Sequence, residues 1–97
     1  MFTTKQRSKL RSLAQNEEPI GQVGKGGLNE NMINGLSDAL EKRELIKITV
    51  LNNVEDDISD IAAELAEKLR AEIVCIIGHK VVLYRYSHKD NVKHIEF

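Results

Sequence analysis

The amino-acid sequence predicts a single α/β (α+β) domain in which a mixed four-stranded sheet packs with helices. The first observation is the length, because 97 residues fall within the usual size of one domain. The second is the order of hydrophobic periodicities along the chain, which is helix, strand, helix, strand, helix, strand, strand. The third is that two helical crossovers precede a hairpin, an order that gives both parallel and antiparallel strand pairs.

The first helix is predicted over residues 4 to 15, with an apolar stripe between two basic borders. At about 100° per residue, four apolar side chains fall within one arc, namely Phe2, Leu10, Leu13 and Ala14. Lys5 and Lys9 border this arc on one side, and Arg7 and Arg11 border it on the other. We therefore expect cations along both edges of the buried stripe, an arrangement that a merely solvated helix face would share.

A short strand and a second helix follow. Pro19 ends the preceding segment, and residues 20 to 23 form a strand that its central Gly21 weakens. The second helix runs from about residue 30 to residue 43, and Asn29 is its expected N-cap. Its buried face is given by five apolar residues at helical spacing, which are Met32, Ile33, Leu36, Ala39 and Leu40.

The second half of the chain supplies three more strands and one more helix. Residues 45 to 51 alternate as a half-buried strand, and the segment DDISDIAAELAEKLRAE is a helix that Asp56 or Asp57 caps. Residues 73 to 77 are all apolar and predict a strand buried on both faces. Gly78 and His79 then turn the chain into a strand over 81 to 87. We expect a domain over residues 1–86 and a polar tail over 87–97 that frays.

Composition favours a soluble cytoplasmic protein and divides the charge unevenly. No apolar run reaches the roughly 20 residues of a membrane span, and the first residues lack the apolar stretch of a signal peptide. The one cysteine, Cys75, excludes an internal disulfide and is expected to be a small buried side chain. Residues 1–16 carry a charge of +4 and the rest carry −5, within a net charge of −1. A polyanion would therefore meet one end of the sequence preferentially.

The segment VGKGGLNEN, residues 23 to 31, offers a bare backbone and one cation directly before a helix. Glycines allow close approach to the main chain, and the free amides and dipole of a helix N-terminus attract anions. Lys25 adds a full positive charge. The spacing matches neither a Walker loop nor a dinucleotide-binding fingerprint. It leaves a GxxG pattern from Gly24 to Gly27, which also clamps nucleic-acid backbone in KH domains. A loop that is glycine-rich only to turn the chain is the alternative.

Other features favour binding over catalysis. His79, His88 and His94 are not placed beside a nucleophile, and their spacing does not match that of zinc ligands. We therefore expect no enzyme, no catalytic residue, no metal and no cofactor. Tyr84 and Tyr86 alternate with Arg85 on the last strand, where core packing and stacking on a nucleic-acid base both remain open.

The chain resembles the CRM domain, the chloroplast RNA splicing and ribosome maturation family, in its bacterial stand-alone form. The resemblance runs from about Thr4 to Tyr86 and depends on a combination of motifs, which are residues 10–14 (LRSLA), 24–28 (GKGGL) and 44–47 (ELIK), Gly78, and residues 83–85 (LYR). It implies a fold similar to the C-terminal domain of translation initiation factor three. It also implies that the protein binds RNA, and that in bacteria it associates with precursors of the large ribosomal subunit. Gln15 and Gly21 depart from the pattern of many relatives.

The expected RNA-binding residues combine this resemblance with the charge pattern, and the protein is expected to act as a monomer. They are Gly24, Lys25, Gly26, Gly27, Leu28 and Asn29 in the loop, Lys5, Arg7, Lys9 and Arg11 in the first helix, and Lys47 and Arg85 on strands. One alternative is a module that binds a small phosphorylated metabolite or a nucleotide at the GKGG segment. Another is an adaptor that acts only through protein contacts.

Overall fold

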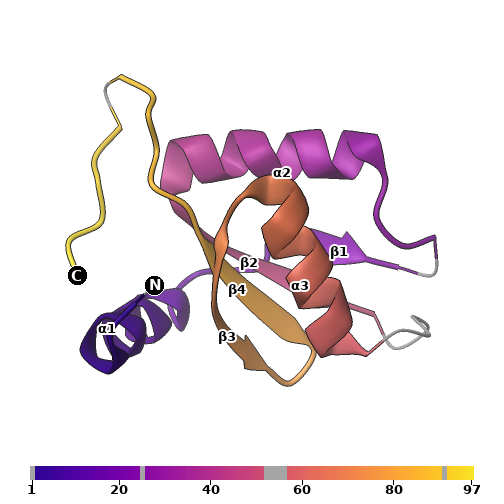
Figure 1. The fold of residues 1–97 in the computed structure, drawn as a ribbon, viewed down its shortest axis with the longest axis horizontal. Helices are drawn as coiled ribbons and strands as arrows, with labels where there is room; N and C mark the ends of the chain where they lie inside the picture. The colour runs from indigo at the N-terminus through magenta and orange to yellow at the C-terminus, as the bar shows by residue number, and fades with distance from the viewer. Residues whose placement is uncertain (1, 25, 52–56, 91) are drawn as a thin grey trace.

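The computed structural model describes residues 2–24, 26–51, 57–90 and 92–97, and its helices and strands follow the predicted order (Figure 1). The elements are α1 (Thr4–Ala14), β1 (Gly21–Val23), α2 (Glu30–Arg43), β2 (Leu45–Val50), α3 (Ile58–Leu69), β3 (Glu72–Ile77) and β4 (Lys80–Tyr84). None of the helices in these residues is long and apolar enough to cross a membrane.

The four strands form one mixed sheet in the order β1-β2-β4-β3. β1 pairs parallel to β2, whereas β4 pairs antiparallel to both β2 and β3. Gly78 has a φ of 58° in the tight β3–β4 turn, a conformation that glycine adopts without steric cost. The fold class predicted from the sequence is therefore confirmed.

Helices α2 and α3 cover one face of the sheet and enclose the larger hydrophobic core (Figure 1). The alternating residues Ile46, Ile48 and Val50 of β2 point into this core because successive strand side chains face opposite ways. The helices contribute Leu36, Leu40, Ile61, Ala62, Leu65 and Leu69, all at the predicted helical spacing.

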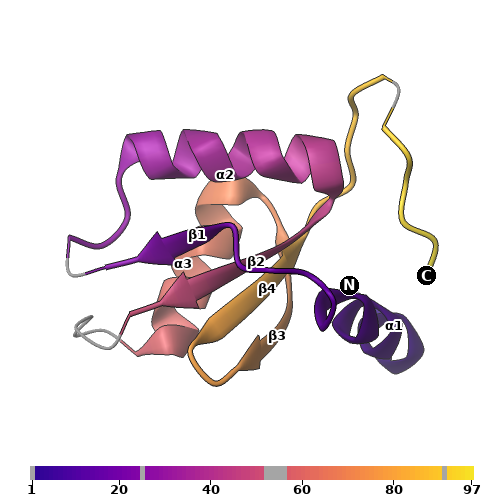
Figure 2. The same cartoon turned by 180° about the vertical axis from the view of Figure 1, so that it is seen from behind.

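Helix α1 lies on the opposite face of the sheet and builds a second, smaller core. Leu10 and Ala14 of α1 are fully buried there against Leu45, Val74, Val82 and Tyr84. Leu13, which the sequence places in the buried arc, is instead 37% exposed. Helix α1 covers only one end of this face of the sheet (Figure 2). The stripe of buried residues on α1 is therefore narrower than the sequence predicts.

The burial of strand β3 differs from the sequence prediction. The prediction of a strand buried on both faces is wrong, because β3 is an edge strand and Ile76 and Ile77 are each 37% exposed. A bulge between Ile73 and Cys75 interrupts the alternation of this strand, so that Val74 and Cys75 both pack on the side of the small core. The last strand, β4, ends at Tyr84 and not at residue 87 as predicted. At the start of α3, Asp57 occupies the N-cap position, but its side chain makes no cap hydrogen bond. Asp56 lies outside the described residues.

The C-terminal segment packs onto the domain instead of fraying. The backbone N–H groups of Ser87 and Ile95 donate to the buried carboxylate of Glu44 at 2.7 and 2.8 Å. Ile95 packs against the small core, and the ring of Phe97 lies edge-on to those of Phe2 and Tyr84. The end of the chain therefore lies beside α1, as both views of the ribbon show (Figures 1 and 2).

Candidate nucleic-acid interface

Helix α1 presents its cations in two lines, as the sequence predicts. Lys5 and Lys9 are exposed and lie on the side of the helix that faces the C-terminal segment, where both line a hollow with Phe97. Arg7 lies on the other side, where it bonds to β3, and Arg11 follows one helical turn later on that same side. The helix therefore carries positive charge towards the tail and towards the sheet.

Arg7 uses part of its hydrogen-bonding capacity inside the protein. Its Nη1 donates to the carbonyl oxygens of Ile73 and Val74 at 2.9 and 2.8 Å, at the bulge of β3. Its guanidinium carbon also lies 5.9 Å from the centre of the Phe2 ring, within the range of a cation–π contact. Arg7 thus fastens α1 to the edge strand while it keeps its charge near the surface.

Beyond α1, no other helix of the described residues covers this face of the sheet (Figure 2). Its strands add further polar and basic side chains. Lys47 alternates with Ile46 and Ile48, which point into the large core, so its side chain lies on the α1 side. Thr49 lies on the same side, and its cross-strand partner Lys80 shares that face. Strands β2 and β4 therefore continue the basic surface of the helix.

Three of the predicted cations converge on one side chain. Burial raises the pKa of the Cys75 thiol above its ordinary 9.0, while the charges of Arg11, Arg7 and Lys47 act in the opposite direction. Arg11 lies one helical turn beyond Arg7 on the same side of α1, and Lys47 points to the α1 side of the sheet, so the three cations share this face. The structure thus brings the two arginines of α1 together with a lysine of β2 that stands at least 36 positions later in the sequence.

Three described glycines, Gly24, Gly26 and Gly27, follow β1. The N–H of Gly27 donates to the carbonyl oxygen of Gly24 at 2.9 Å, so this amide, which the sequence suggests as a free donor, is already paired. Gly27 has a φ of 71°, which disfavours any side chain. Gly26 is exposed, and nothing lies within 4 Å of a Cβ placed there. Lys25, the cation of this loop, lies outside the described residues.

The N-terminus of α2 lies where the sequence predicts it. Part of its capacity to bind an anion is already used within the protein. Asn29 is the N-cap, and its Oδ1 accepts the N–H of Met32 at 2.8 Å. Glu30 places a carboxylate in the first turn, where it already interacts with the positive end of the helix dipole. Leu28 is half-buried and packs against the large core. An anion at this helix end would therefore meet competition.

The turn between β1 and α2 and the basic helix α1 lie at opposite ends of the molecule in both views (Figures 1 and 2). The longest dimension of the molecule is 35 Å. One phosphate cannot contact both, so the two predicted halves of the site act together only on an extended ligand.

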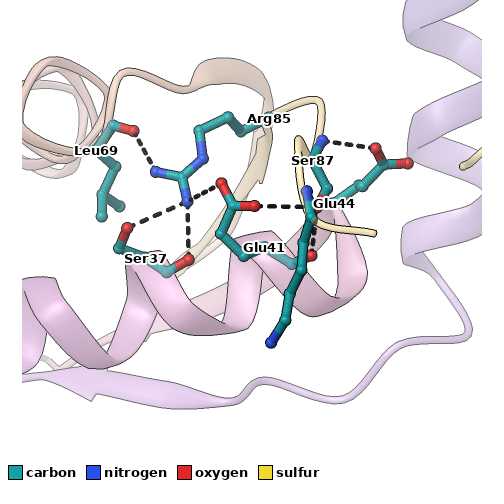
Figure 3. Close-up of polar contacts among 7 residues, drawn as sticks. Ser37, Glu41, Glu44, Leu69, Arg85 and Ser87 are labelled. Carbon is teal, nitrogen blue, oxygen red and sulfur yellow. Dashed lines mark hydrogen bonds and ion pairs between the residues drawn. The ribbon is translucent and has the colours of Figure 1, made fainter. Parts of the chain in front are cut away.

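Arg85 occupies a different environment from the other predicted contacts (Figure 3). Its guanidinium donates from Nη1 to the carbonyl oxygen of Leu69 at 2.8 Å, and from Nη2 to the carbonyl oxygen of Ser37 at 2.8 Å. Nη2 also pairs with Oε1 of Glu41 at 3.2 Å, and the Arg85 side chain is only 17% exposed. This arginine joins α2, α3 and β4 on the face opposite α1.

The sequence model of the CRS1 / YhbY (CRM) domain matches residues 2–85. The chain belongs to the CRS1 / YhbY (CRM) domain family. The match includes α1, the GKGG segment and Lys47, and it ends directly before Tyr86 and the C-terminal segment.

Two relatives and one solved structure are similar to this CRM domain chain over almost their full length. The chain is 51% identical over 96 residues to Probable RNA-binding protein YqeI of Bacillus subtilis. This match covers 99% of this chain and 98% of that protein. It is 32% identical over 92 residues to an RNA-binding protein of Haemophilus influenzae, with 95% and 93% covered. The solution structure of a hypothetical protein of Staphylococcus aureus, provisionally described as RNA-binding, matches with 52% identity and a TM-score of 0.78 over 94% and 95% of the two chains.

The CRM domain also carries aromatic residues whose surroundings the sequence leaves open. Tyr84 is buried in the small core, whereas Tyr86 is 50% exposed and stacks on His94 with ring centres 4.2 Å apart. Sequence reasoning misses Phe97 entirely, because it stands in a polar segment without periodicity. Among the described residues, no group of three or more His, Cys, Asp or Glu side chains is placed to hold a metal ion.

Proposed function

We propose that this protein is a noncatalytic RNA-binding protein of the bacterial cytoplasm that acts as a monomer on ribosomal RNA in a precursor of the large ribosomal subunit. The observation that carries RNA binding is that Arg7 and Arg11 of α1 and Lys47 of β2 lie on the same side of the sheet. The names of the relatives support the same ligand, and the resemblance of the sequence motifs to the CRM family supports its ribosomal source.

The proposed contact begins on α1 and on this side of the sheet. Lys5, Lys9 and Arg11 of α1 and Lys47 of β2 supply ammonium and guanidinium groups to phosphates, and Arg7 contributes its charge. A line of phosphates matches several separated cations better than one phosphorylated metabolite does. Arg85 is left out of this contact, because its guanidinium is bonded to α2 and α3.

The loop residues Gly24, Lys25, Gly26, Gly27, Leu28 and Asn29 are proposed to contact the same RNA farther along. The molecule is 35 Å long, a span equal to about ten nucleotides at the roughly 3.4 Å per nucleotide of a helical strand. We therefore expect oligonucleotides clearly shorter than this to contact only one of the two regions.

The salt dependence of RNA affinity tests this proposal. If three or four phosphates of a single strand are contacted, affinity falls about 20- to 50-fold between about 50 and 200 mM salt, since each contact adds a slope of about −0.7. Lys25→Ala, Arg11→Ala and Lys47→Ala should each make the slope shallower by about 0.7. Lys42→Ala is the matched control, because Lys42 is exposed on α2, across the sheet from α1.

Crosslinking in a bacterial cell extract, followed by sequencing of the bound RNA, tests the ribosomal part. Precursors of large-subunit RNA should be enriched relative to the Arg11→Ala, Lys47→Ala double variant. Enrichment of other RNA classes alone would contradict the assignment. Saturable binding of a mononucleotide or sugar phosphate, without affinity for RNA beyond that of a charge-matched polyanion, would favour the small-ligand alternative.

A further inference from the structure

The C-terminal segment is fixed firmly enough to take part in a binding site. The carboxylate of Glu44, which is fully buried, accepts the N–H of Ser87 at one end of the segment and the N–H of Ile95 near the other. The Oγ of Ser87 also donates to the carbonyl oxygen of Glu41 at 2.6 Å (Figure 3). These bonds set the position of the two residues that follow Ile95.

Phe97 is held at the surface by aromatic contacts. Its ring centre lies 5.6 Å from that of Phe2 and 5.0 Å from that of Tyr84, both in edge-to-face geometry. The side chain nevertheless remains 37% exposed. An aromatic side chain that is both supported from below and open to solvent can accept a flat ring against it.

A hollow of about 780 Å³ lies between this side chain and α1, within the usual range of small-ligand sites. Its lining residues are Thr3, Lys5, Gln6, Ser8, Lys9, Glu96 and Phe97. Thr3 and Gln6 are bonded to each other in the capping box of α1. The groups that characterise the hollow are therefore one aromatic side chain, two ammonium groups, the hydroxyl of Ser8 and one side-chain carboxylate.

This combination fits a nucleotide better than a free anion. The Lys5 and Lys9 ammonium groups attract a phosphate, and Phe97 offers the apolar surface that a base requires. Glu96 repels an isolated anion, so the carboxylate favours a ligand whose phosphate stays on the lysine side while an uncharged part extends towards the tail. Lys5 and Lys9 also belong to the proposed RNA contact, which makes the hollow continuous with it.

We propose that the hollow between α1 and the C-terminal segment takes one nucleotide of the bound RNA, with its base stacked on Phe97 and its phosphate paired with Lys5 and Lys9. This rests on the proposed RNA-binding function and adds to it a contact to a base. Stacking accepts all four bases, so the site gives affinity for unpaired nucleotides without a strict sequence preference.

The test uses a single-stranded RNA of about twelve nucleotides and a series of the same RNA with one abasic position. Phe97→Leu should weaken binding of the intact RNA about 5- to 140-fold, the value of one stacked base, whereas Phe97→Tyr should keep wild-type affinity. One RNA of the abasic series should lack the base that stacks on Phe97. The wild-type protein and Phe97→Leu should bind that RNA equally, because the stacking partner is already missing. Ile76→Ala is the control, since Ile76 is also 37% exposed but lies on edge strand β3, outside the residues that line the hollow.

Two results would overturn the inference while the proposed function stands. Phe97→Leu could bind the intact RNA as tightly as the wild type, or it could lose the same factor on every abasic RNA, which would indicate a general loss of structure. Two measurements distinguish a general loss of structure from the loss of the aromatic ring, namely the thermal unfolding of Phe97→Leu and the RNA affinity of Phe97→Tyr. If the wild-type protein binds RNA no better than a charge-matched polyanion, the proposed function itself fails, and the inference fails with it.

Discussion

Oε2 of Glu44 lies 2.7 Å from Nδ1 of His94, a contact that joins the end of α2 to the C-terminal segment. Glu44 is fully buried, and it stands at the C-cap of α2 with a φ of 64°. Burial by itself would raise the pKa of this carboxyl, but hydrogen bonds from Ser87, His94 and Ile95 outweigh burial and bring the pKa below its ordinary 4.5. The ionised carboxylate is therefore the form that the fold stabilises.

We predict that Glu44 stabilises the protein at neutral pH and stops doing so in acid. A folded-state pKa below the unfolded value of about 4.5 means that the contribution is complete above that value and is lost as pH falls through the folded-state pKa. Glu44→Gln should lower the free energy of unfolding by about 1.5 to 3 kcal/mol near pH 7, because an amide replaces a charged acceptor. Denaturant unfolding of both proteins from about pH 7 to about pH 3 should show this difference shrinking. A difference that stays constant across this range would contradict the assignment.

Arg85→Lys should destabilise the protein without changing how RNA affinity depends on salt. Lysine cannot reproduce the planar fork that reaches the carbonyl oxygens of Leu69 and Ser37 together. We expect a loss of about 1 to 3 kcal/mol, because buried acceptors lose a charged donor. Unfolding in urea measures the loss, and a salt titration of RNA binding provides the second readout. A slope that becomes shallower by about 0.7 would return Arg85 to the RNA contact.

The sequence was sufficient for the order of the elements and for the packing faces of α2, α3 and β2. The apolar spacing of α3 and the alternation of β2 each permit only one face to be buried, so periodicity by itself identifies Ile61, Leu65 and Ile48 as core residues. The N-cap Asn29 and the turn at Gly78 follow from local chemistry in the same way. Local rules are adequate where the deciding contacts lie within a few residues.

The sequence was insufficient where a contact joins distant residues. Glu44 stands among charged residues and gives no local sign that it will be buried by a segment about 50 positions later, the separation of its partner His94. Arg85 continues a strand pattern, and only the packing of α2 and α3 shows that its guanidinium is bonded within the protein. Phe97 stands in a polar stretch, so its contact with Phe2 could not be inferred from periodicity.

Gly26 and Gly27 should respond in opposite ways to alanine. Gly27→Ala places a side chain at a φ of 71° and should cost about 1 kcal/mol of stability. Gly26→Ala meets open space, so it should leave stability unchanged or raise it by about 0.4 to 1 kcal/mol. If RNA backbone approaches the turn closely, Gly26→Ala nevertheless weakens RNA binding. Calorimetry and a binding titration of both variants provide the comparison, and full affinity of Gly26→Ala would exclude a close approach at this position.

Cys75 reports on the face where the basic residues converge. It is half-buried on β3, and burial raises the pKa of its thiol above 9.0 despite the opposing charges of Arg11, Arg7 and Lys47. At pH 7 the protonated thiol is therefore the dominant form, and the reactive thiolate is the minor one. The chain contains one cysteine, so any alkylation reports on this position alone.

Bound RNA should slow the alkylation of Cys75 by iodoacetamide. Phosphates that pair with Arg11 and Lys47 remove the charges that favour the thiolate, so the pKa of the thiol rises further, and the RNA also covers the approach to the sulfur. The rate in the free protein should increase with pH through the alkaline range, and saturating RNA should reduce it at every pH. The Arg11→Ala, Lys47→Ala double variant should react more slowly than the wild type when free, and RNA should change its rate less. An unchanged rate in the wild-type protein under saturating RNA would place the RNA on another surface, because an anion that pairs with these cations weakens their effect on the pKa of the thiol.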